Sequence, residues 1–450
     1  MENKKVENLE SLDYNIFLTL VRKGKIEGKD LIRLCNTSRK LNEYSSRSFQ
    51  VKNSEGVYVG EPIPQYLFVI LLNDKRIRIF PGQNPREIYK RRTIGGRIWG
   101  FGSNGSGQLG LGDQNYRLIP TSIPILNNIV QVSAGELHSL ILDSQGRVWS
   151  FGYNGSGQLG LGDTNTRLTP IAISNLSNIV QVSTGENHSL VLDNQGRVWS
   201  FGSNASGQLG LGLKSDNISL PTLIPNLENI IQVSVGEAHS LILDDQGRVW
   251  SFGCDDSGQL GLGDENKNRN AVILPTLIPN LNNIIQISVR ESCSLVLDSQ
   301  GRVWSFGLNT TGQLGLRFKQ DSITLPTLIL NLENIVTICA GHAHSLALDN
   351  RGSVWSFGHN YDGELGLGGK ETRRQFPALI PNLDNIVEIN AGSFHSLALD
   401  NRGCVWSFGN NHHGQLGLGD EDNKRIPTLI PNLNGVFQIS AGVKYSLVLK

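Results

Sequence analysis

Short apolar or alternating runs, separated by turn residues, recur along most of the chain. The stretch Val148-Trp149-Ser150-Phe151 alternates between the two sides of an extended strand. Residues 179–183 and 188–192 are β-branched or apolar, and a weaker run follows Pro170, a residue suited to an edge strand. The segment Asp193-Asn194-Gln195-Gly196 is a turn signal. The pattern predicts a unit of four short strands, named here A (179–183), B (188–192), C (the Trp strand) and D (after the proline).

This unit occurs seven times. All seven tryptophans of the chain occupy the same place in strand C, with successive spacings of 50, 50, 51, 54, 51 and 51 residues. They are Trp99, Trp149, Trp199, Trp250, Trp304, Trp355 and Trp406. The 51 glycines among 450 residues fit a chain with many tight turns. Four short strands per repeat of this length are typical of β-propeller blades.

The phase of the repeat predicts how the ring closes. The first unit opens at Gly96 on a C strand, whereas the chain ends at residues 446–450 on a B strand. The last A and B strands therefore lack C and D, and the first C and D strands lack A and B. Pairing the two halves removes both free edges. We therefore expect an all-β, seven-bladed β-propeller over residues 96–450, with the A–B and C–D loops on one face.

Three phrases carry a family resemblance: Gly-Arg-Val-Trp-Ser-Phe-Gly, Gly-Gln-Leu-Gly-Leu-Gly and Ala-Gly-x-x-His-Ser-Leu. The chain resembles the regulator-of-chromosome-condensation repeat family, which implies a seven-bladed propeller but no single function. The founding member exchanges nucleotide on the small GTPase Ran through a protruding β-wedge. The longest insertion here, residues 264–270, leaves no room for such a wedge. The Gly-Trp-Arg-His-Thr motif of the plant UV-B photoreceptor is missing. Other relatives carry a HECT ubiquitin ligase domain, and because this chain ends with the ring, we do not expect it to be such a ligase.

The first 95 residues predict a separate region. Residues 1–50 predict two short amphipathic helices that faintly resemble an F-box, a module that docks a Skp-like adaptor of ubiquitin ligases. A plain helical cap or an unrelated helical module is the alternative. Residues 51–95 predict a connecting segment with a β-hairpin over 67–80.

Charge and composition narrow the function classes. The 40 basic and 40 acidic residues balance, but residues 1–95 carry a net charge of +7 and the remainder −7, so generic nucleic-acid binding is disfavoured. Five scattered cysteines without a Cys-x-x-Cys pair indicate neither a disulfide framework nor a zinc site. With no signal-peptide pattern and a longest apolar run of only Leu67–Leu72, we expect an intracellular protein, cytoplasmic or nuclear, with no membrane partner.

Repeated polar residues are expected to be structural. The Gly-x-Gly-x-x-Gly patterns recur as turns without a strand–turn–helix context, so no dinucleotide cofactor is predicted. One histidine per repeat in a fixed frame predicts a framework hydrogen bond near the start of strand B and no metal site. These are His138, His188, His239, His344 and His395. With no catalytic constellation outside the repeat background, we expect no catalytic residue and no enzymatic activity.

Positions where the repeat departs from its own consensus are the candidate protein-binding residues. Four A–B loops carry carboxylates that would form an acidic arc on one face: Glu136, Glu186, Glu237 and Glu291. Repeat four breaks the histidine frame with Arg290 and Cys293. On the opposite arc, non-repeated residues predict a protein-binding hot spot: Tyr361, Asp362, Phe394, His412, His413, Lys444 and Tyr445. The favoured function is a non-catalytic interaction scaffold whose loop face binds a protein, as in a ubiquitin-ligase substrate receptor; the alternative is an exchange factor or regulator of a Ran-like small GTPase.

Overall fold

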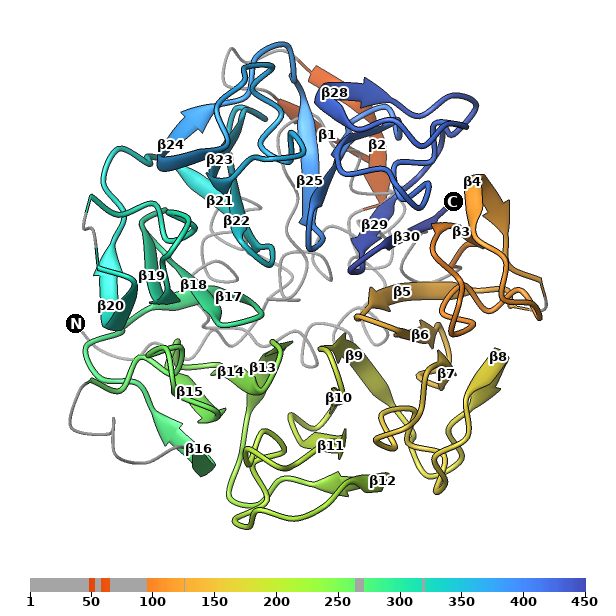
Figure 1. The fold of residues 1–450 in the computed structure, drawn as a ribbon, viewed down its shortest axis with the longest axis vertical. Helices are drawn as coiled ribbons and strands as arrows, with labels where there is room; N and C mark the ends of the chain where they lie inside the picture. Colours follow the sequence, from red (N-terminus) through yellow and green to blue (C-terminus); the bar gives the residue numbers. More distant parts are fainter. Residues whose placement is uncertain (1–47, 53–57, 65–94, 125, 264–270, 318–319) are drawn as a thin grey trace, which may run out of the picture. The chain divides into compact units, whose positions relative to one another are not determined.

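Seven four-stranded antiparallel sheets form a closed ring (Figure 1). The structure is a computed structural model that describes residues 48–52, 58–64, 95–124, 126–263, 271–317 and 320–450. The chain divides into two compact units, Met1–Arg92 and Thr93–Lys450, and the ring occupies the second. The predicted all-β, seven-bladed propeller is confirmed.

Each sheet is one blade with its strands in the order A-B-C-D. The A strands are β5 (Ile129–Ala134), β9 (Ile179–Thr184), β13 (Ile230–Val235), β17 (Ile284–Arg290), β21 (Ile335–Ala340), β25 (Ile386–Ala391) and β29 (Gln438–Ala441). The B strands are β6 (His138–Asp143), β10 (His188–Asp193), β14 (His239–Asp244), β18 (Cys293–Asp298), β22 (His344–Asp349), β26 (His395–Asp400) and β30 (Tyr445–Leu449). The C strands are β7 (Val148–Gly152), β11 (Val198–Gly202), β15 (Val249–Gly253), β19 (Val303–Leu308), β23 (Val354–His359), β27 (Val405–Gly409) and β3 (Ile98–Gly102). The D strands are β8 (Arg167–Ala172), β12 (Ile218–Leu223), β16 (Val272–Leu277), β20 (Ser322–Leu328), β24 (Arg373–Leu379), β28 (Lys424–Leu429) and β4 (Arg117–Ser122). Blades are numbered one to seven in the order of their A strands.

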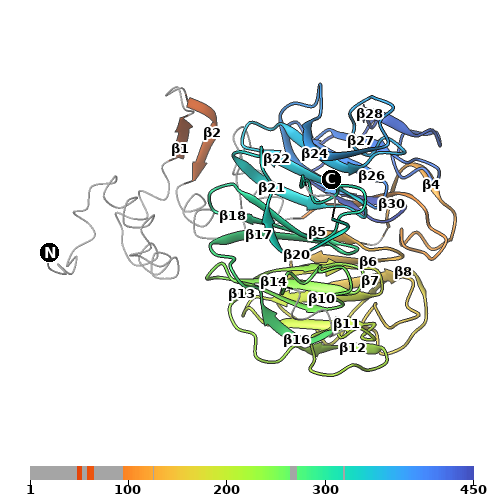
Figure 2. The same ribbon diagram turned by 60° about the vertical axis from the view of Figure 1, so that its left-hand side comes forward.

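Blade seven joins the two ends of the ring, as the phase of the repeat predicts. Its sheet order is β29-β30-β3-β4, and β30 pairs with β3 in a register that sets Val448 opposite Trp99 and Ser446 opposite Phe101. Figures 1 and 2 both place β30, which leads to the C-terminus, in the sheet that contains β4. The ring therefore has no unpaired blade edge at the junction between its first and last strands.

The core is made between blades. Strand B is buried along its whole length in blade two, and the Phe of strand C is fully buried in every blade. Clusters of buried aliphatic residues combine strands of neighbouring blades; one of them contains Leu140 of blade one and Val191 of blade two. Packing therefore repeats from blade to blade, which explains why one sequence pattern serves seven times.

The histidines form the predicted framework. His188 Nε2 lies 2.9 Å from Ser240 Oγ of the next blade, and that hydroxyl donates to the Gln208 carbonyl at 3.0 Å. The same His–Ser contact, at 2.9 to 3.0 Å, is made by His138, His239, His344 and His395. Burial lowers the pKa of all five imidazoles to about 3, so they are neutral.

The N-terminal unit is described only in one strand pair. β1 (Ser48–Lys52) pairs antiparallel with β2 (Tyr58–Pro64), a pair that the sequence pattern did not predict. The predicted F-box-like helices and the predicted hairpin over 67–80 lie outside the described residues. Across the described residues, no helix has the length and apolarity needed to cross a bilayer.

The end of β3 and the loop that follows it offer a matched pair of glycines. Gly102 has φ +100°, and a Cβ there would lie 2.5 Å from the Lys444 carbonyl oxygen, whereas a Cβ at Gly105 would meet nothing within 4 Å. We expect Gly102→Ala to lower the free energy of unfolding by about 2–4 kcal/mol because it adds strain and a backbone clash. Gly105→Ala should change it by less than about 0.5 kcal/mol. Urea unfolding of the two variants measures the difference, and equal midpoints would contradict it.

Candidate functional site

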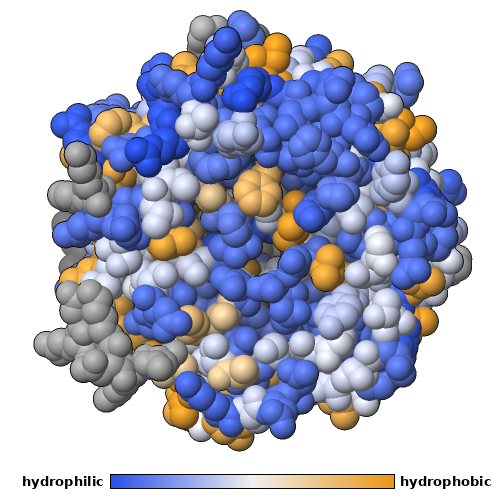
Figure 3. Space-filling view, viewed as in Figure 1, coloured by the Kyte–Doolittle hydropathy of each residue, from blue (hydrophilic) through white to orange (hydrophobic). Residues whose placement is uncertain are grey.

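The A–B and C–D loops lie at the same end of the blades because the strands alternate in direction. In a space-filling view along the ring axis, hydrophilic residues cover most of the surface around a hollowed centre, with scattered hydrophobic residues between them (Figure 3). The predicted site residues belong to these loops or border them, so they can be compared on one face.

Four carboxylates of the acidic arc come from consecutive A–B loops of blades one to four. Backbone hydrogen bonds tie these loops together: Glu136 N donates to the Gly185 carbonyl and Glu237 N to the Glu291 carbonyl, both at 3.2 Å. Burial, together with the neighbouring Glu136 and Glu291, raises the pKa of Glu186 to about 7. Burial and the charges of Glu291 and Glu186 also raise the pKa of Glu237. The arc therefore concentrates like charges that repel one another.

Glu291 connects the arc to blade five. Its Oε1 lies 2.7 Å from His342 Nδ1, and its backbone has a left-handed φ of 47°. Burial works to raise the pKa of this carboxyl, but the His342 imidazole and the Arg290 guanidinium outweigh it and hold the pKa below its usual value. Glu291 is thus stabilised in its charged form, unlike Glu186 and Glu237.

Arg290 spans the ring. Its Nη1 donates to the Ala441 carbonyl at 2.9 Å, which links the end of β17 in blade four to the end of β29 in blade seven. Burial lowers the pKa of the guanidinium, whereas Glu291 and Glu136 act against that shift. Arg290 is therefore an internal counter-charge for the arc as well as a candidate contact residue.

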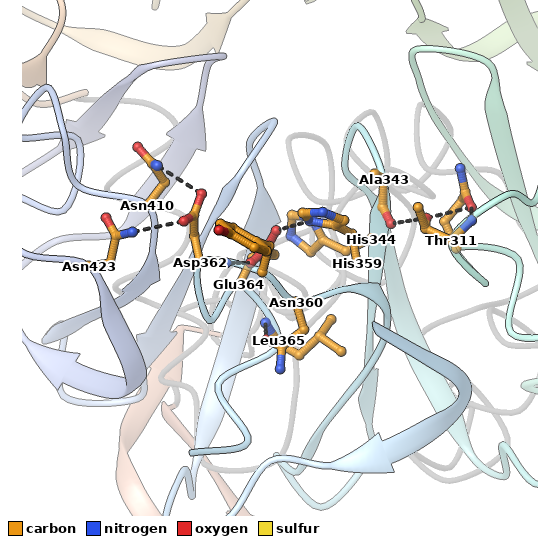
Figure 4. Close-up of polar contacts among 12 residues, drawn as sticks. Thr311, Ala343, His344, His359, Asn360, Asp362, Glu364, Leu365, Asn410 and Asn423 are labelled. Carbon is orange, nitrogen blue, oxygen red and sulfur yellow. Dashed lines mark hydrogen bonds and ion pairs between the residues drawn. The ribbon is translucent and has the colours of Figure 1, made fainter. Parts of the chain in front are cut away.

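The C–D loop of blade five is held rigidly. Tyr361 is 64% exposed, and its carbonyl accepts a hydrogen bond from Arg425 Nη2 at 2.6 Å. The Asp362 carboxylate accepts from Asn410 Nδ2 and Asn423 Nδ2, both at 2.8 Å (Figure 4). An exposed aromatic side chain on a fixed loop loses little entropy on binding, as in protein-binding hot spots.

Phe394 joins the two predicted arcs. Its ring centroid lies 5.2 Å from that of His342, which binds Glu291, and 6.0 Å from that of His359. His359 in turn lies 6.4 Å from the Tyr361 ring and forms an ion pair with the buried Glu364 (Figure 4). The acidic arc and the aromatic residues, predicted on opposite arcs, are thus connected through residues of blades five and six.

Sequence reasoning missed His342, His359 and Glu364 as members of the site. A signal for Glu364 was present, because its loop has Gly-Glu-Leu-Gly where the other repeats have Gly-Gln-Leu-Gly. His342 was visible only as the residue that ends the acidic series, and His359 follows a glycine at a position that varies among repeats.

The remaining candidates separate into surface and framework residues. His412 and Lys444 are exposed, and His413 is half-buried, with a pKa lowered by burial and by the charge of Lys444. Tyr445 is fully buried, so its assignment to the binding surface is wrong. It replaces the framework histidine of blade seven, and its hydroxyl donates to the His138 carbonyl at 2.7 Å and lies 2.9 Å from Ser139 Oγ.

Within the described part of the chain, no group of three or more His, Cys, Asp or Glu side chains is arranged to hold a metal ion. The cysteines described there, Cys254, Cys293, Cys339 and Cys404, are not disulfide-bonded. What the site offers is charge, aromatic surface and a rigid backbone, which together suit recognition of another macromolecule.

Comparisons with known proteins agree with this architecture. The chain is 38% identical over 208 residues to the human probable E3 ubiquitin-protein ligase HERC6, covering 44% of this chain and 20% of that protein. It is 32% identical over 215 residues to protein pim1 of Schizosaccharomyces pombe, covering 44% and 40%. The chain thus matches only about a fifth to two fifths of the length of these relatives.

Solved structures match over most of the ring. Human WBSCR16 superposes with a TM-score of 0.72 at 25% identity, covering 79% of this chain and 98% of that one. Prp20p of Saccharomyces cerevisiae, studied for its binding to Gsp1p and histones, superposes with a TM-score of 0.71 at 25% identity, covering 80% and 94%. A family model described as the RCC1-like domain matches residues 97–448. The chain therefore belongs to the RCC1-like domain family.

Proposed function

We propose that this chain is a non-catalytic protein-interaction scaffold whose acidic arc binds a basic surface of a protein partner. The observation that carries the proposal is the grouping of four carboxylates in consecutive loops, where burial and then the neighbouring carboxylates raise the pKa of Glu186 and Glu237. Crowded like charges destabilise the free protein. A cationic partner would relieve that repulsion, so the arc contributes more to a complex than to the fold.

A receptor role in a ubiquitin ligase is the specific form of this proposal. Its support is that HERC6, a relative at 38% identity, is named as a probable ubiquitin-protein ligase. In this form the propeller face holds a substrate inside the cell, and the segment 1–50, for which the sequence predicts helices, contacts a Skp-like adaptor. Affinity capture with the full chain and with residues 96–450 tests it, because only the full chain should retain the adaptor.

A regulator of a Ran-like small GTPase is the second candidate. Its support is the similarity to Prp20p, which was studied for its binding to Gsp1p, over 80% of this chain. In that case residues 96–450 alone should capture a small GTPase, and excess nucleotide should release it. If residues 96–450 also accelerate nucleotide release from that GTPase, the regulator proposal would be favoured over the receptor proposal.

Neutralising the arc tests its role directly. We expect the combined substitution E136Q/E186Q/E237Q/E291Q to weaken binding of the captured partner at least about tenfold at low salt, because four steering charges are lost. The difference should shrink at high salt, where charges are screened. The matched control is E228Q/D245N/E333Q/D384N, which removes four exposed carboxylates from loops at the other end of the blades. Equal losses in both variants, or none in the first, would refute the proposal.

A further inference from the structure

Blade five reverses the polarity of a side-chain contact that three of the other blades make. In the C–D loops of the other six blades, a glutamine accepts a hydrogen bond from the backbone N–H two residues earlier; these are Gln108, Gln158, Gln208, Gln259, Gln313 and Gln415. In three of them the glutamine Nε2 also donates to the side chain five residues earlier, as Gln108 does to Ser103 Oγ at 3.4 Å. Blade five has Glu364 in place of the glutamine and His359 five residues before it. The amide donor is gone, and the residue opposite has become the donor.

The exchange places a buried carboxyl group against His359 and favours the positively charged imidazole. The Glu364 side chain is fully buried; its Oε1 contacts His359 Nδ1, and its Oε2 accepts from the Asp362 N–H at 2.9 Å. A buried carboxylate is stable only beside a counter-charge, and His359 is its ion-pair partner. The hydrogen bond to Glu364 accordingly raises the pKa of His359. An imidazolium carries a proton on both nitrogens, so Nε2 is a second donor.

That second donor faces away from Glu364. The His359 side chain is 27% exposed, and the described residues provide no hydrogen-bond partner for Nε2. The aromatic rings of Phe394 and Tyr361 lie near the imidazole, at 6.0 and 6.4 Å between centroids. In the β23–β24 ladder Arg373 pairs directly with His359, so both cationic side chains project from the same side of the sheet.

The carboxylates near this donor are already occupied. Asp362 is bound by Asn410 and Asn423, and Glu371 is paired with Arg374 at 3.0 Å. Glu364 balances the charge of His359, whereas Arg373 has no ion-pair partner among the described residues, so Arg373 places an unpaired positive charge across the ladder from the imidazole.

We propose that His359, Arg373 and the rings of Phe394 and Tyr361 form a docking site for a carboxylate side chain, flanked by an apolar residue, of a protein partner. The carboxylate would accept from His359 Nε2, and the apolar residue would contact the two rings. This inference rests on the proposed protein-binding function and extends it, because the partner would place basic groups over the acidic arc and an acidic group over blade five. Two opposite poles on one face would fix the orientation of the partner.

The test uses the full chain and two fluorescein-labelled peptides, Gly-Glu-Phe-Glu-Gly and Gly-Gln-Phe-Gln-Gly. Fluorescence anisotropy at pH 7 should show that the wild-type protein prefers the glutamate peptide by about tenfold, as expected for a hydrogen bond to a charged group. The variant H359S/E364Q restores the Ser103 and Gln108 arrangement of blade seven, so it should fold normally and lose the preference. Arg373→Gln, at an exposed position, should reduce the preference about two- to threefold.

The outcomes separate this site from the acidic arc. The variant E136Q/E186Q/E237Q/E291Q should still bind the glutamate peptide in preference to the glutamine peptide, even though its affinity for the captured partner protein is reduced. A folded H359S/E364Q protein that retains the preference, or a wild-type protein that shows none, would overturn the inference. If the H359S/E364Q protein does not fold, an unchanged preference in the Arg373→Gln variant would overturn the inference.

Discussion

A chain that ends at Lys444 is expected to lose the folded propeller. The removed strand β30 pairs with β29 on one side and β3 on the other, so its loss leaves two facing edges unpaired. It also removes the fully buried side chains of Tyr445, Leu447, Val448 and Leu449. Burying each of these contributes about 1.5–3 kcal/mol, and together they approach the whole stability of a typical domain. Circular dichroism and urea unfolding should show no cooperative transition.

The control removes a segment of the other unit. A chain of residues 93–450 keeps every strand of the ring and should unfold cooperatively with a midpoint close to that of the full chain. A chain ending at Lys444 that unfolds at the same midpoint would show that the pairing of β30 with β3 does not hold the ring together.

The fold could be predicted because the same four-stranded unit occurs seven times in the sequence. A single Val-Trp-Ser-Phe phrase is an ambiguous strand signal, but seven copies in phase indicate the blade, its number and the closing junction together. Closure by β30 and β3 followed from the phase alone, without any knowledge of the contact between Val448 and Trp99. The framework role of the histidines was also predictable, since side chains that recur at one position in five separate blades cannot converge on a single ligand.

The site could be predicted only in part, because its residues meet across blades. The repeat places Glu136 and Glu186 in neighbouring loops, so the acidic arc follows from sequence. The contacts that individual side chains make cannot be predicted from the repeat. Arg290 crosses the ring to the Ala441 carbonyl, and Tyr445 turns inward to Ser139. Departure from a consensus therefore identifies unusual positions without showing whether they face solvent or the core.

The exchange in blade five illustrates the same limit. Glu364 and His359 each look like a single substitution in a variable loop. Only their contact, with Glu364 fully buried, shows that the two changes compensate each other. Pairs of this kind can be sought in other repeat proteins by comparing positions five residues apart within each unit.

Acid is expected to destabilise the propeller already between pH 7 and pH 5.5, above the usual pKa values of carboxyl groups. The five framework histidines have a pKa of about 3 in the folded protein, against 6.5 when exposed in the unfolded chain. The unfolded chain therefore binds protons first as the pH falls. Their contribution to stability is complete above about pH 6.5 and is lost progressively toward pH 3. At pH 5.5 the loss is about 1.4 kcal/mol for each histidine.

Three ionisable side chains oppose the destabilisation by acid. The pKa of Glu186 is raised to about 7, and those of Glu237 and His359 are also raised, so these groups favour the folded protein as the pH falls. All three are at least partly exposed, whereas the five framework histidines are fully buried, so the histidines should dominate. The net expectation is a loss of several kcal/mol between pH 7 and pH 5.5.

Urea unfolding at a series of pH values between 8 and 5 measures this loss as a falling midpoint. His188→Cys supplies a matched comparison, because blade four already holds Cys293 at the equivalent position and that side chain is fully buried. The variant removes one of five titrating groups, so its stability should fall about one fifth less steeply with pH, even where it is lower at pH 8. A wild-type midpoint that stays level down to pH 5 would contradict this prediction. It would mean that the histidines take up protons in the folded protein about as readily as in the unfolded chain, despite their burial against the neighbouring serines.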